Sequence, residues 1–138
     1  MGIILKSKNK TLAKKKADKY FSEFIRKRDE NKPCITCGQY KKDMDAGHFI
    51  SRRFEATRYD EMNCNAQCLK CNRFENGNQF AHGKAIDRLY GLGTSDKILA
   101  LSRKIMKRTQ FDYEVIADYY KSAIEWLPIF LLISYTFI

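Results

Sequence analysis

The sequence lacks a hydrophobic run long enough to act as a secretory signal or to cross a membrane. Residues 3–5 are apolar, but a lysine-rich stretch follows at once, so they are too short for the core of a signal peptide. Residues 126–138 are largely apolar and include Pro128, yet they fall short of the roughly 20 residues that span a bilayer. We therefore expect a cytoplasmic protein without an integral membrane segment. Three interpretations of residues 126–138 stay open: a buried or partner-covering segment, association with a membrane surface, or an end without a selected function.

Acidic residues are also few. The chain has 16 Asp and Glu against 26 Lys and Arg, which gives a formal charge of +10. Such a charge on a short chain favours a polyanionic partner, either nucleic acid or an anionic membrane. Residues 1–33 hold 11 basic and 4 acidic residues, residues 34–91 hold 9 and 7, and residues 92–138 hold 6 and 5. The N-terminal third therefore carries most of the excess, and we expect Lys14, Lys15 and Lys16 either to contact DNA phosphates or to form a solvated helix face.

The chain has five cysteines, and their spacing is informative. Four of the five cysteines form two Cys-x-x-Cys pairs, Cys34 with Cys37 and Cys68 with Cys71. Two such pairs can supply four thiolates to one tetrahedral zinc ion, and the segment between them is long enough for a hairpin. Without a signal for secretion, thiolates that meet a metal are more plausible than disulfides. The remaining cysteine, Cys64, is expected to be a small buried residue beside the metal site, with a ligand role as the alternative.

Hydrophobic periodicity predicts helices on both sides of the cysteine-bearing segment. Residues 11–28 repeat apolar side chains at helical spacing, and Pro33 ends this first helix. A helix over residues 79–90 ends before Gly91, and two further helices follow, one capped by Thr94 or Ser95 and one capped by Asp112. The apolar face of the first helix is formed by Ala17, Tyr20, Phe21, Phe24 and Ile25.

Between the cysteine pairs we expect a β-hairpin. Its first strand should lie within residues 41–51 and its returning strand near residues 62–65, separated by a polar loop. A helix should start at the second Cys-x-x-Cys and carry Asn72 in its first turn. We expect a single domain with three parts: a basic helical arm over residues 1–33, a zinc-stabilised core over residues 34–91, and a helical part with the apolar tail over residues 92–138.

The chain carries four short motifs: Phe24-Ile-Arg-Lys-Arg-Asp29, Pro33-Cys-Ile-Thr-Cys-Gly38, Asp45-Ala-Gly-His48 and Gln67-Cys-Leu-Lys-Cys-Asn72. These motifs resemble those of the NinG (Rap) recombination proteins of lambdoid phages. In addition, His48, Asn63 and Asn72 follow the order of the His-Asn-His (HNH), or ββα-metal, nucleases, with asparagine at the last position as in the endonuclease VII group. The resemblance implies an α+β fold: a small zinc-bound treble-clef or ββα-metal core with a β-hairpin, flanked by N- and C-terminal helices.

The resemblance also implies roles for the motif residues. His48 would be the general base, because imidazole titrates near neutral pH, although a structural or metal-ligating histidine is the alternative. Asn63 would tie the hairpin strands together and so orient the base, with Asn65 in its place if the register slips. Asn72 would present its amide oxygen to Mg²⁺ or Mn²⁺, unless it only caps a helix.

The second ligand of this catalytic ion is less certain from sequence. The endonuclease VII group has an acidic residue directly before the histidine, whereas this chain has Gly47, and the nearest acid is Asp45. In a regular strand Asp45 and His48 lie on opposite faces, so Asp45 reaches the ion only if Gly47 permits a bulge. His82 is expected to be a surface histidine.

Together these features predict a metal-dependent DNA endonuclease. The resemblance to the NinG family implies that it acts on branched or recombination-intermediate DNA in a bacterial host cytoplasm. A homodimer is left open. Arg52 and Arg53 would clamp a phosphate, or else form a solvated loop. The alternative function is a treble-clef module that binds nucleic acid without cleaving it.

Overall fold

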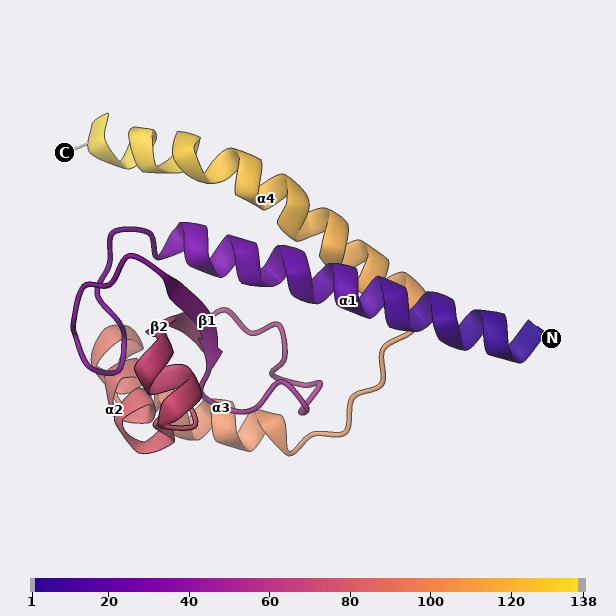
Figure 1. The fold of residues 1–138 in the computed structure, drawn as a ribbon, viewed down its shortest axis with the longest axis horizontal. Helices are drawn as coiled ribbons and strands as arrows, with labels where there is room; N and C mark the ends of the chain where they lie inside the picture. The colour runs from indigo at the N-terminus through magenta and orange to yellow at the C-terminus, as the bar shows by residue number, and fades with distance from the viewer. Residues whose placement is uncertain (1, 137–138) are drawn as a thin grey trace. The chain divides into compact units, whose positions relative to one another are not determined.

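The computed structural model describes the backbone of residues 2–136 and the side chains of residues 8–128. The chain forms two compact units. The helical unit consists of the segments up to Arg28 and from Arg108 onwards, and the central unit runs from Asp29 to Lys107. Figure 1 shows the elements of both units in chain order. The predicted core, residues 34–91, lies in the central unit together with residues up to Lys107.

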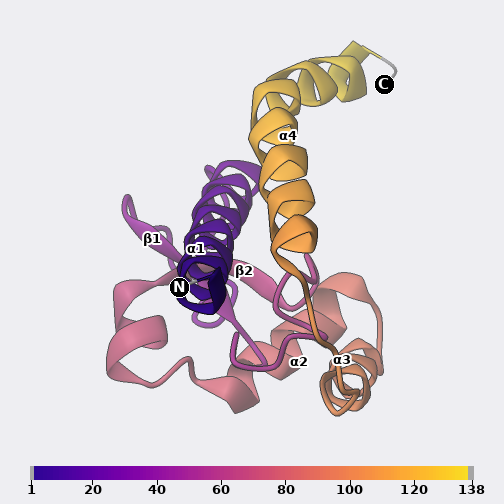
Figure 2. The same ribbon diagram turned by 90° about the vertical axis from the view of Figure 1, so that its right-hand side faces the viewer.

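The helical unit pairs helix α1 (Gly2–Arg28) with helix α4 (Gln110–Thr136). The apolar face predicted for the first helix is buried at Phe21, Phe24 and Ile25, so that prediction is confirmed, and the helix begins earlier than expected. The Phe21 and Phe24 rings each lie 5.0 Å from the Tyr120 ring of α4. The two helices run along one another in both views (Figures 1 and 2). Ring packing of this kind explains how segments far apart in sequence form one unit.

Helix α4 starts with a reciprocal pair of side chains. The Asp112 backbone amide donates to Thr109 Oγ1 at 3.2 Å, and the Thr109 amide donates to Asp112 Oδ2 at 2.6 Å. Thr109 is therefore the N-cap residue, and the Asp112 side chain accepts a hydrogen bond from it in return. This corrects the prediction that Asp112 itself is the cap. Those contacts, with nearby basic groups, hold the pKa of Asp112 below its usual value.

The central unit is built around a two-stranded antiparallel hairpin of β1 (Met44–His48) and β2 (Cys64–Cys68). The register is one-to-one, from Met44 opposite Cys68 to His48 opposite Cys64. The predicted α+β class and hairpin are confirmed, but the returning strand begins later than predicted and extends through Cys68. Every residue of β2 is buried, including the polar Asn65 and Gln67, so this strand lies at the centre of the unit.

Three short helices follow the hairpin. A five-residue turn of π-helix, η1 (Lys70–Phe74), replaces the helix predicted at the second cysteine pair. Helix α2 (Gln79–Tyr90) has the predicted bounds and ends at Gly91, whose φ of 114° suits glycine. Helix α3 (Thr94–Ser102) starts after Gly93, so neither Thr94 nor Ser95 is its cap as predicted. It brings Ile98 into a buried cluster with Ile50 and Ile86. The cluster joins α2 and α3 to the segment that leaves β1.

No helix in the part of the chain that the structure describes is both long and apolar enough to cross a membrane. The apolar segment 126–138 continues α4, which contains Pro128 and changes direction in its C-terminal part (Figure 2). Trp126 is exposed. The side chains of residues 129–138 lie outside the described residues, and so do the three interpretations of this segment.

We predict that Tyr120→Ala loosens the helical unit, because deleting a buried aromatic side chain costs about 3–5 kcal/mol. Tyr120 is 6% exposed, whereas its neighbour Tyr119 is 61% exposed and serves as the matched control. Hydrogen exchange of the α1 amides should become roughly 100-fold faster in Tyr120→Ala and change far less in Tyr119→Ala. Equal exchange rates in the two variants would contradict the packing described above.

Candidate functional site

Four cysteines of the central unit form a group that could hold a metal ion. The sulfur atoms of Cys34, Cys37, Cys68 and Cys71 all lie within 4.8 Å of one another. Cys37 Sγ and Cys68 Sγ are 3.9 Å apart. Four sulfurs bound to one zinc ion at about 2.3 Å would lie about 3.8 Å apart in a regular tetrahedron. The cluster therefore fits the zinc ion that the spacing predicts.

A tight turn places the first cysteine pair. The Gly38 amide donates to the Cys34 carbonyl at 2.8 Å, the Cys34 amide donates to the Gln39 carbonyl at 2.9 Å, and Gly38 has a φ of 71°. This left-handed conformation favours glycine and turns Cys37 back toward Cys34. The second pair lies where β2 ends and η1 begins, with Cys71 inside η1. A metal ion would therefore join the turn, the strand and the π-helical turn.

The thiols differ in how readily they ionise. Burial raises the pKa of the Cys34 thiol, but hydrogen bonds from the backbone amides of Cys37, Cys68 and Thr36 outweigh it and lower that pKa. The Cys68 amide, for example, lies 3.3 Å from Cys34 Sγ. Burial and contacts with the other cysteines raise the pKa of Cys71. Thiolate character at Cys71 is therefore favoured by a bound cation.

Beside the cysteine cluster, η1 meets β1 through three polar side chains. Asn72 Nδ2 donates to Asp45 Oδ2 at 2.8 Å. Arg73 makes a two-pronged ion pair with the same carboxylate, from Nε at 2.8 Å and from a terminal nitrogen at 2.9 Å. Asp45 raises the pKa of Arg73 through this pair. The structure thus brings the two predicted ligands of a catalytic ion together, and adds an arginine that the sequence did not identify.

His48 lies at the other end of β1. Because the ladder pairs residues one-to-one, the bulge that would bring Asp45 round to the histidine is not present in it. Asp45 and His48 therefore leave opposite faces of the strand, and their positions are about 10 Å apart along it. His48 Nε2 donates to the Arg58 carbonyl at 2.9 Å. Because a carbonyl only accepts, Nδ1 carries the lone pair, and the Cys64 sulfur lies 3.7 Å from it.

Asn63 holds the loop between the strands. Its side chain is fully buried and donates from Nδ2 to the carbonyls of Ile50 and Thr57, both at 3.0 Å. Its Oδ1 accepts from the Ile50 amide at 2.8 Å. Asn65, the alternative at this position, instead donates to the Met62 carbonyl at 3.1 Å and accepts from the Tyr90 hydroxyl at 2.8 Å. Asn63 is thus the residue that ties the end of β1 to the start of β2.

His82 is not a surface histidine as predicted, because it is fully buried in α2. Among the described residues, neither of its ring nitrogens has a hydrogen-bond partner. Its ring lies edge-on to the Phe49 ring with centroids 5.9 Å apart. Burial, followed by the nearby His48, lowers the pKa of His82 to about 4, so it is neutral at pH 7. The spacing of His82, Ala85 and Ile86 on one helical face was the signal that could have shown its burial.

The predicted DNA contacts are spread over both units. Arg52 and Arg53 are exposed in the loop after β1, and the Arg53 guanidinium lies 4.9 Å from the centre of the Phe54 ring. The buried Arg58, which was not predicted, donates to the Arg52 carbonyl and so shapes this loop. In the helical unit, Lys15 is exposed, and Lys14 Nζ lies 5.6 Å from the centre of the Tyr113 ring.

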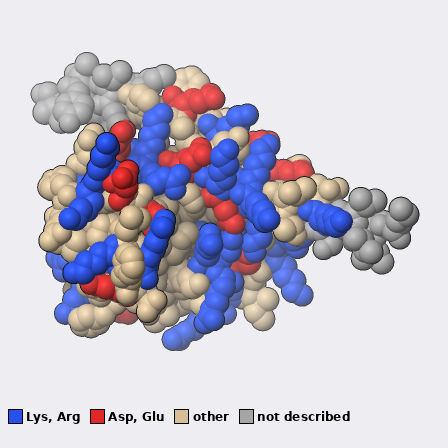
Figure 3. All heavy atoms as spheres, in the orientation of Figure 1, with Lys and Arg blue, Asp and Glu red and all other residues tan. Residues whose placement is uncertain are grey.

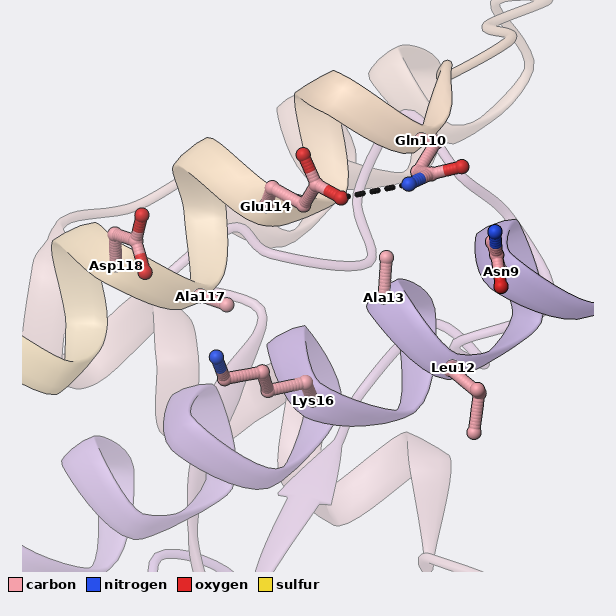
Figure 4. A pocket seen from close by; sticks show the side chains of 8 residues that line it. All are labelled: Asn9, Leu12, Ala13, Lys16, Gln110, Glu114, Ala117 and Asp118. Carbon is pink, nitrogen blue, oxygen red and sulfur yellow. Dashed lines mark hydrogen bonds between the residues drawn. The ribbon is translucent and has the colours of Figure 1, made fainter. Parts of the chain in front are cut away.

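Lys16 lines a groove between α1 and α4 of about 450 Å³. Figure 4 shows Lys16 on one wall, and Glu114 and Asp118 on the other. Gln110 Nε2 donates to Glu114 Oε1 at 2.8 Å in the same groove. Because the groove is open and of mixed charge, it is not a site for a single kind of ion.

Comparison with known proteins adds a family to this geometry. The sequence model described as "Bacteriophage Lambda NinG protein" matches residues 4–128. Protein ninG of Salmonella phage P22 is 34% identical over 86 residues, which cover 61% of this chain and 42% of that protein. Protein ninG of Escherichia phage 933W is 39% identical over 66 residues, which cover 46% of this chain and 33% of that protein. Protein ninG of Escherichia phage lambda is 38% identical over 66 residues, which cover 46% of this chain and 32% of that protein. The matches thus cover less than half of each relative's length. No solved structure matches the chain.

We predict that the purified protein carries about one zinc ion per chain, measured by elemental analysis, and that Cys37→Ser or Cys68→Ser loses it. Structural zinc contributes apparent binding energies of roughly 10–16 kcal/mol to folding, so these variants should also unfold at lower temperature. Cys64→Ala is the matched control, since Cys64 lies outside the four-sulfur cluster and should leave the zinc content unchanged. A zinc-free protein of undiminished thermal stability would contradict the assignment.

Proposed function

The chain belongs to the NinG family of bacteriophage proteins, and on that premise we propose that it is a metal-dependent DNA endonuclease. Its substrate would be branched or recombination-intermediate DNA during phage recombination. The observation that carries the proposal is the 2.8 Å contact between Asn72 and Asp45. It brings an amide and a carboxylate together from different elements, directly after a zinc-ligand cysteine. Oxygen atoms from such groups are the ligands that Mg²⁺ and Mn²⁺ prefer.

Asp45 and Asn72 would hold the catalytic cation. When bound, it would stabilise the charge that builds on the phosphate and on the leaving 3′ oxygen. Asn72 now turns its nitrogen toward Asp45, so its amide must rotate to present Oδ1 as a ligand. Arg73 neutralises Asp45 and is 63% exposed, so it can swing away toward a DNA phosphate at little cost.

His48 would act as the general base. The hydrogen bond to the Arg58 carbonyl fixes the proton on Nε2, which leaves Nδ1 to accept a proton from an attacking water. Asn63 supports this arrangement, because its three side-chain hydrogen bonds hold Ile50 and Thr57 together, and Thr57 directly precedes Arg58. Orientation by a neighbouring group of this kind is common in catalytic sites.

The excess of positive charge supports DNA as the substrate. Figure 3 shows Lys and Arg side chains spread over the face that it displays, and the chain carries a formal charge of +10. Lysine contacts with phosphates would supply affinity that does not depend on sequence. Arg52 and Arg53, on the loop after His48, would hold the phosphate nearest the cleaved bond.

A nucleic-acid-binding module without nuclease activity is the second candidate, and two contacts favour it. Asp45 is fully paired with Arg73, and the Cys64 sulfur lies against Nδ1 of His48. Both contacts occupy groups that a nuclease must use. In addition, Asp45 and His48 leave opposite faces of β1, so the bulge that would bring them to one ion is not present in the ladder. Cleavage assays separate the two candidates, because the binding module would bind DNA without cleaving it, whether or not His48 is present.

We predict that His48→Ala and Asn72→Ala each lower DNA cleavage by roughly 100-fold or more, the scale of a general base or an electrostatic group. Cleavage of flap, junction and plain duplex DNA with Mg²⁺ or Mn²⁺ measures this effect. Zinc content and DNA affinity should stay unchanged. Asn9→Ala, an exposed change on α1, is the control and should cleave like the unmodified protein. Full activity in either test variant would remove the nuclease assignment from this site.

We further predict that changing Lys14, Lys15 and Lys16 together to glutamine weakens binding to all DNA shapes about equally. Each lost phosphate contact should make the slope of log affinity against log salt shallower by about 0.9, so up to about 2.7 in total. Preference for branched DNA should survive. The control changes Lys97, Lys104 and Lys107, which are also exposed, to glutamine. If both triple variants behave alike, only net charge matters and α1 is not a contact surface.

A further inference from the structure

The side chain of Gln67, in β2, is fully buried with its amide held in one orientation. Nε2 lies 2.7 Å from the Gly77 carbonyl and 2.7 Å from Thr36 Oγ1. Because a carbonyl only accepts hydrogen bonds, the atom that faces Gly77 must be the nitrogen. The amide oxygen, Oε1, therefore points the other way, and it has no hydrogen-bond partner among the described residues.

This oxygen fills the space that a side chain at position 47 would take. A Cβ added to Gly47 would lie 2.2 Å from Gln67 Oε1 and 2.8 Å from Gln67 Cβ. Glycine is thus required at position 47 for the amide to lie over the strand. A buried acceptor without a partner costs about 1–3 kcal/mol, so an oxygen held in this way is expected to serve a ligand.

The oxygen also lies on the same face as the two proposed ligands of the cation. Gln67 is directly opposite Asp45 in the ladder, so their side chains share one face of the hairpin. Gly77 connects Gln67 with Asn72, because its carbonyl accepts from Gln67 and its amide donates to the Asn72 carbonyl at 2.9 Å. A Cβ at Gly77 would lie 3.9 Å from the His48 carbonyl. Gln67, Asn72 and the end of β1 therefore meet at one glycine.

We propose that Gln67 Oε1 is a ligand of the same divalent cation as Asp45 and Asn72. This inference rests on the proposed function, since it adds an oxygen to the cation site proposed there. The three ligand groups come from β1, β2 and η1, and all are oxygens of the kind that Mg²⁺ and Mn²⁺ select. Oε1 lies beside Gly47, the residue before His48, whereas Asp45 lies three residues before it. Gln67 thus lies with Asp45 and Gly47 on the face of the hairpin opposite to that of His48.

Binding of Mn²⁺ to the zinc-loaded protein without DNA tests the proposal, with electron paramagnetic resonance reporting free Mn²⁺. Gln67→Leu removes the oxygen and should weaken Mn²⁺ binding by roughly 10-fold or more. Gly47→Ala keeps Gln67 but forces Oε1 out of place, so it should weaken binding similarly. Gln67→Glu keeps an oxygen and adds charge, so it should bind at least as tightly as the unmodified protein. Thr36→Val, which removes only a partner of the nitrogen, should stay within a few-fold.

Zinc content and circular dichroism confirm that each variant is folded, and Gly47→Ala serves if Gln67→Leu does not fold. The ligand role is overturned if folded Gln67→Leu or Gly47→Ala binds Mn²⁺ as tightly as the unmodified protein while Asn72→Ala does not. That result leaves the nuclease proposal standing. If the unmodified protein binds no Mn²⁺ even at millimolar concentration, the cation site itself is absent and both proposals fail.

Discussion

Four sulfur atoms within 4.8 Å of one another are the constraint on which the central unit depends. Four thiolates at that distance repel one another unless a cation lies among them, and four thiols would make only weak hydrogen bonds. The hairpin is only five residues long on each side, and an isolated two-stranded hairpin is marginal in water. Holding the first turn, the end of β2 and η1 at one point therefore fixes Asn72 relative to β1 more firmly than the strands could alone.

The parts of the fold that depend on local sequence were predictable. The cysteine spacing predicts the metal cluster, and Gly91 marks the end of α2 because its φ of 114° suits few other residues. The α1 face was visible as a helical repeat, but its partner was not, since nothing local links Phe21 to Tyr120. The ion pair of Arg73 with Asp45 was missed for the same reason, because it joins two elements and because the π-helical turn of η1 shifts which side chains face the hairpin. The burial of His82, by contrast, could have been inferred from its helical spacing with Ala85 and Ile86.

The candidate site combines one carboxylate with two amides and a guanidinium. Asn72 and Arg73 both donate to Asp45, and Gln67 donates from its nitrogen to Gly77 and Thr36. Asn63 differs, because its side chain makes hydrogen bonds to the backbone of Ile50 and Thr57 in its own loop. Asn63 therefore fixes the shape of the loop, whereas Asn72 and Gln67 are the residues that could bind an ion. The left-handed turn at Asn76, Gly77 and Asn78 lies between η1 and α2. Its Gly77 makes hydrogen bonds with the Gln67 side chain and the Asn72 carbonyl.

The pairing of α1 with α4 has a consequence for the timing of synthesis. On the ribosome, α1 is made first, but the residues that cover Phe21 and Phe24 come only after residues 29–107 have been added. At roughly 5–20 residues per second, that interval lasts about 4–16 s. The central unit, with its cysteines close in space, has time to take up metal and fold while the α1 aromatic face is still bare. During those seconds α4 is not yet there to cover the aromatic face of α1, so only other molecules that bind the nascent chain can shield it from water.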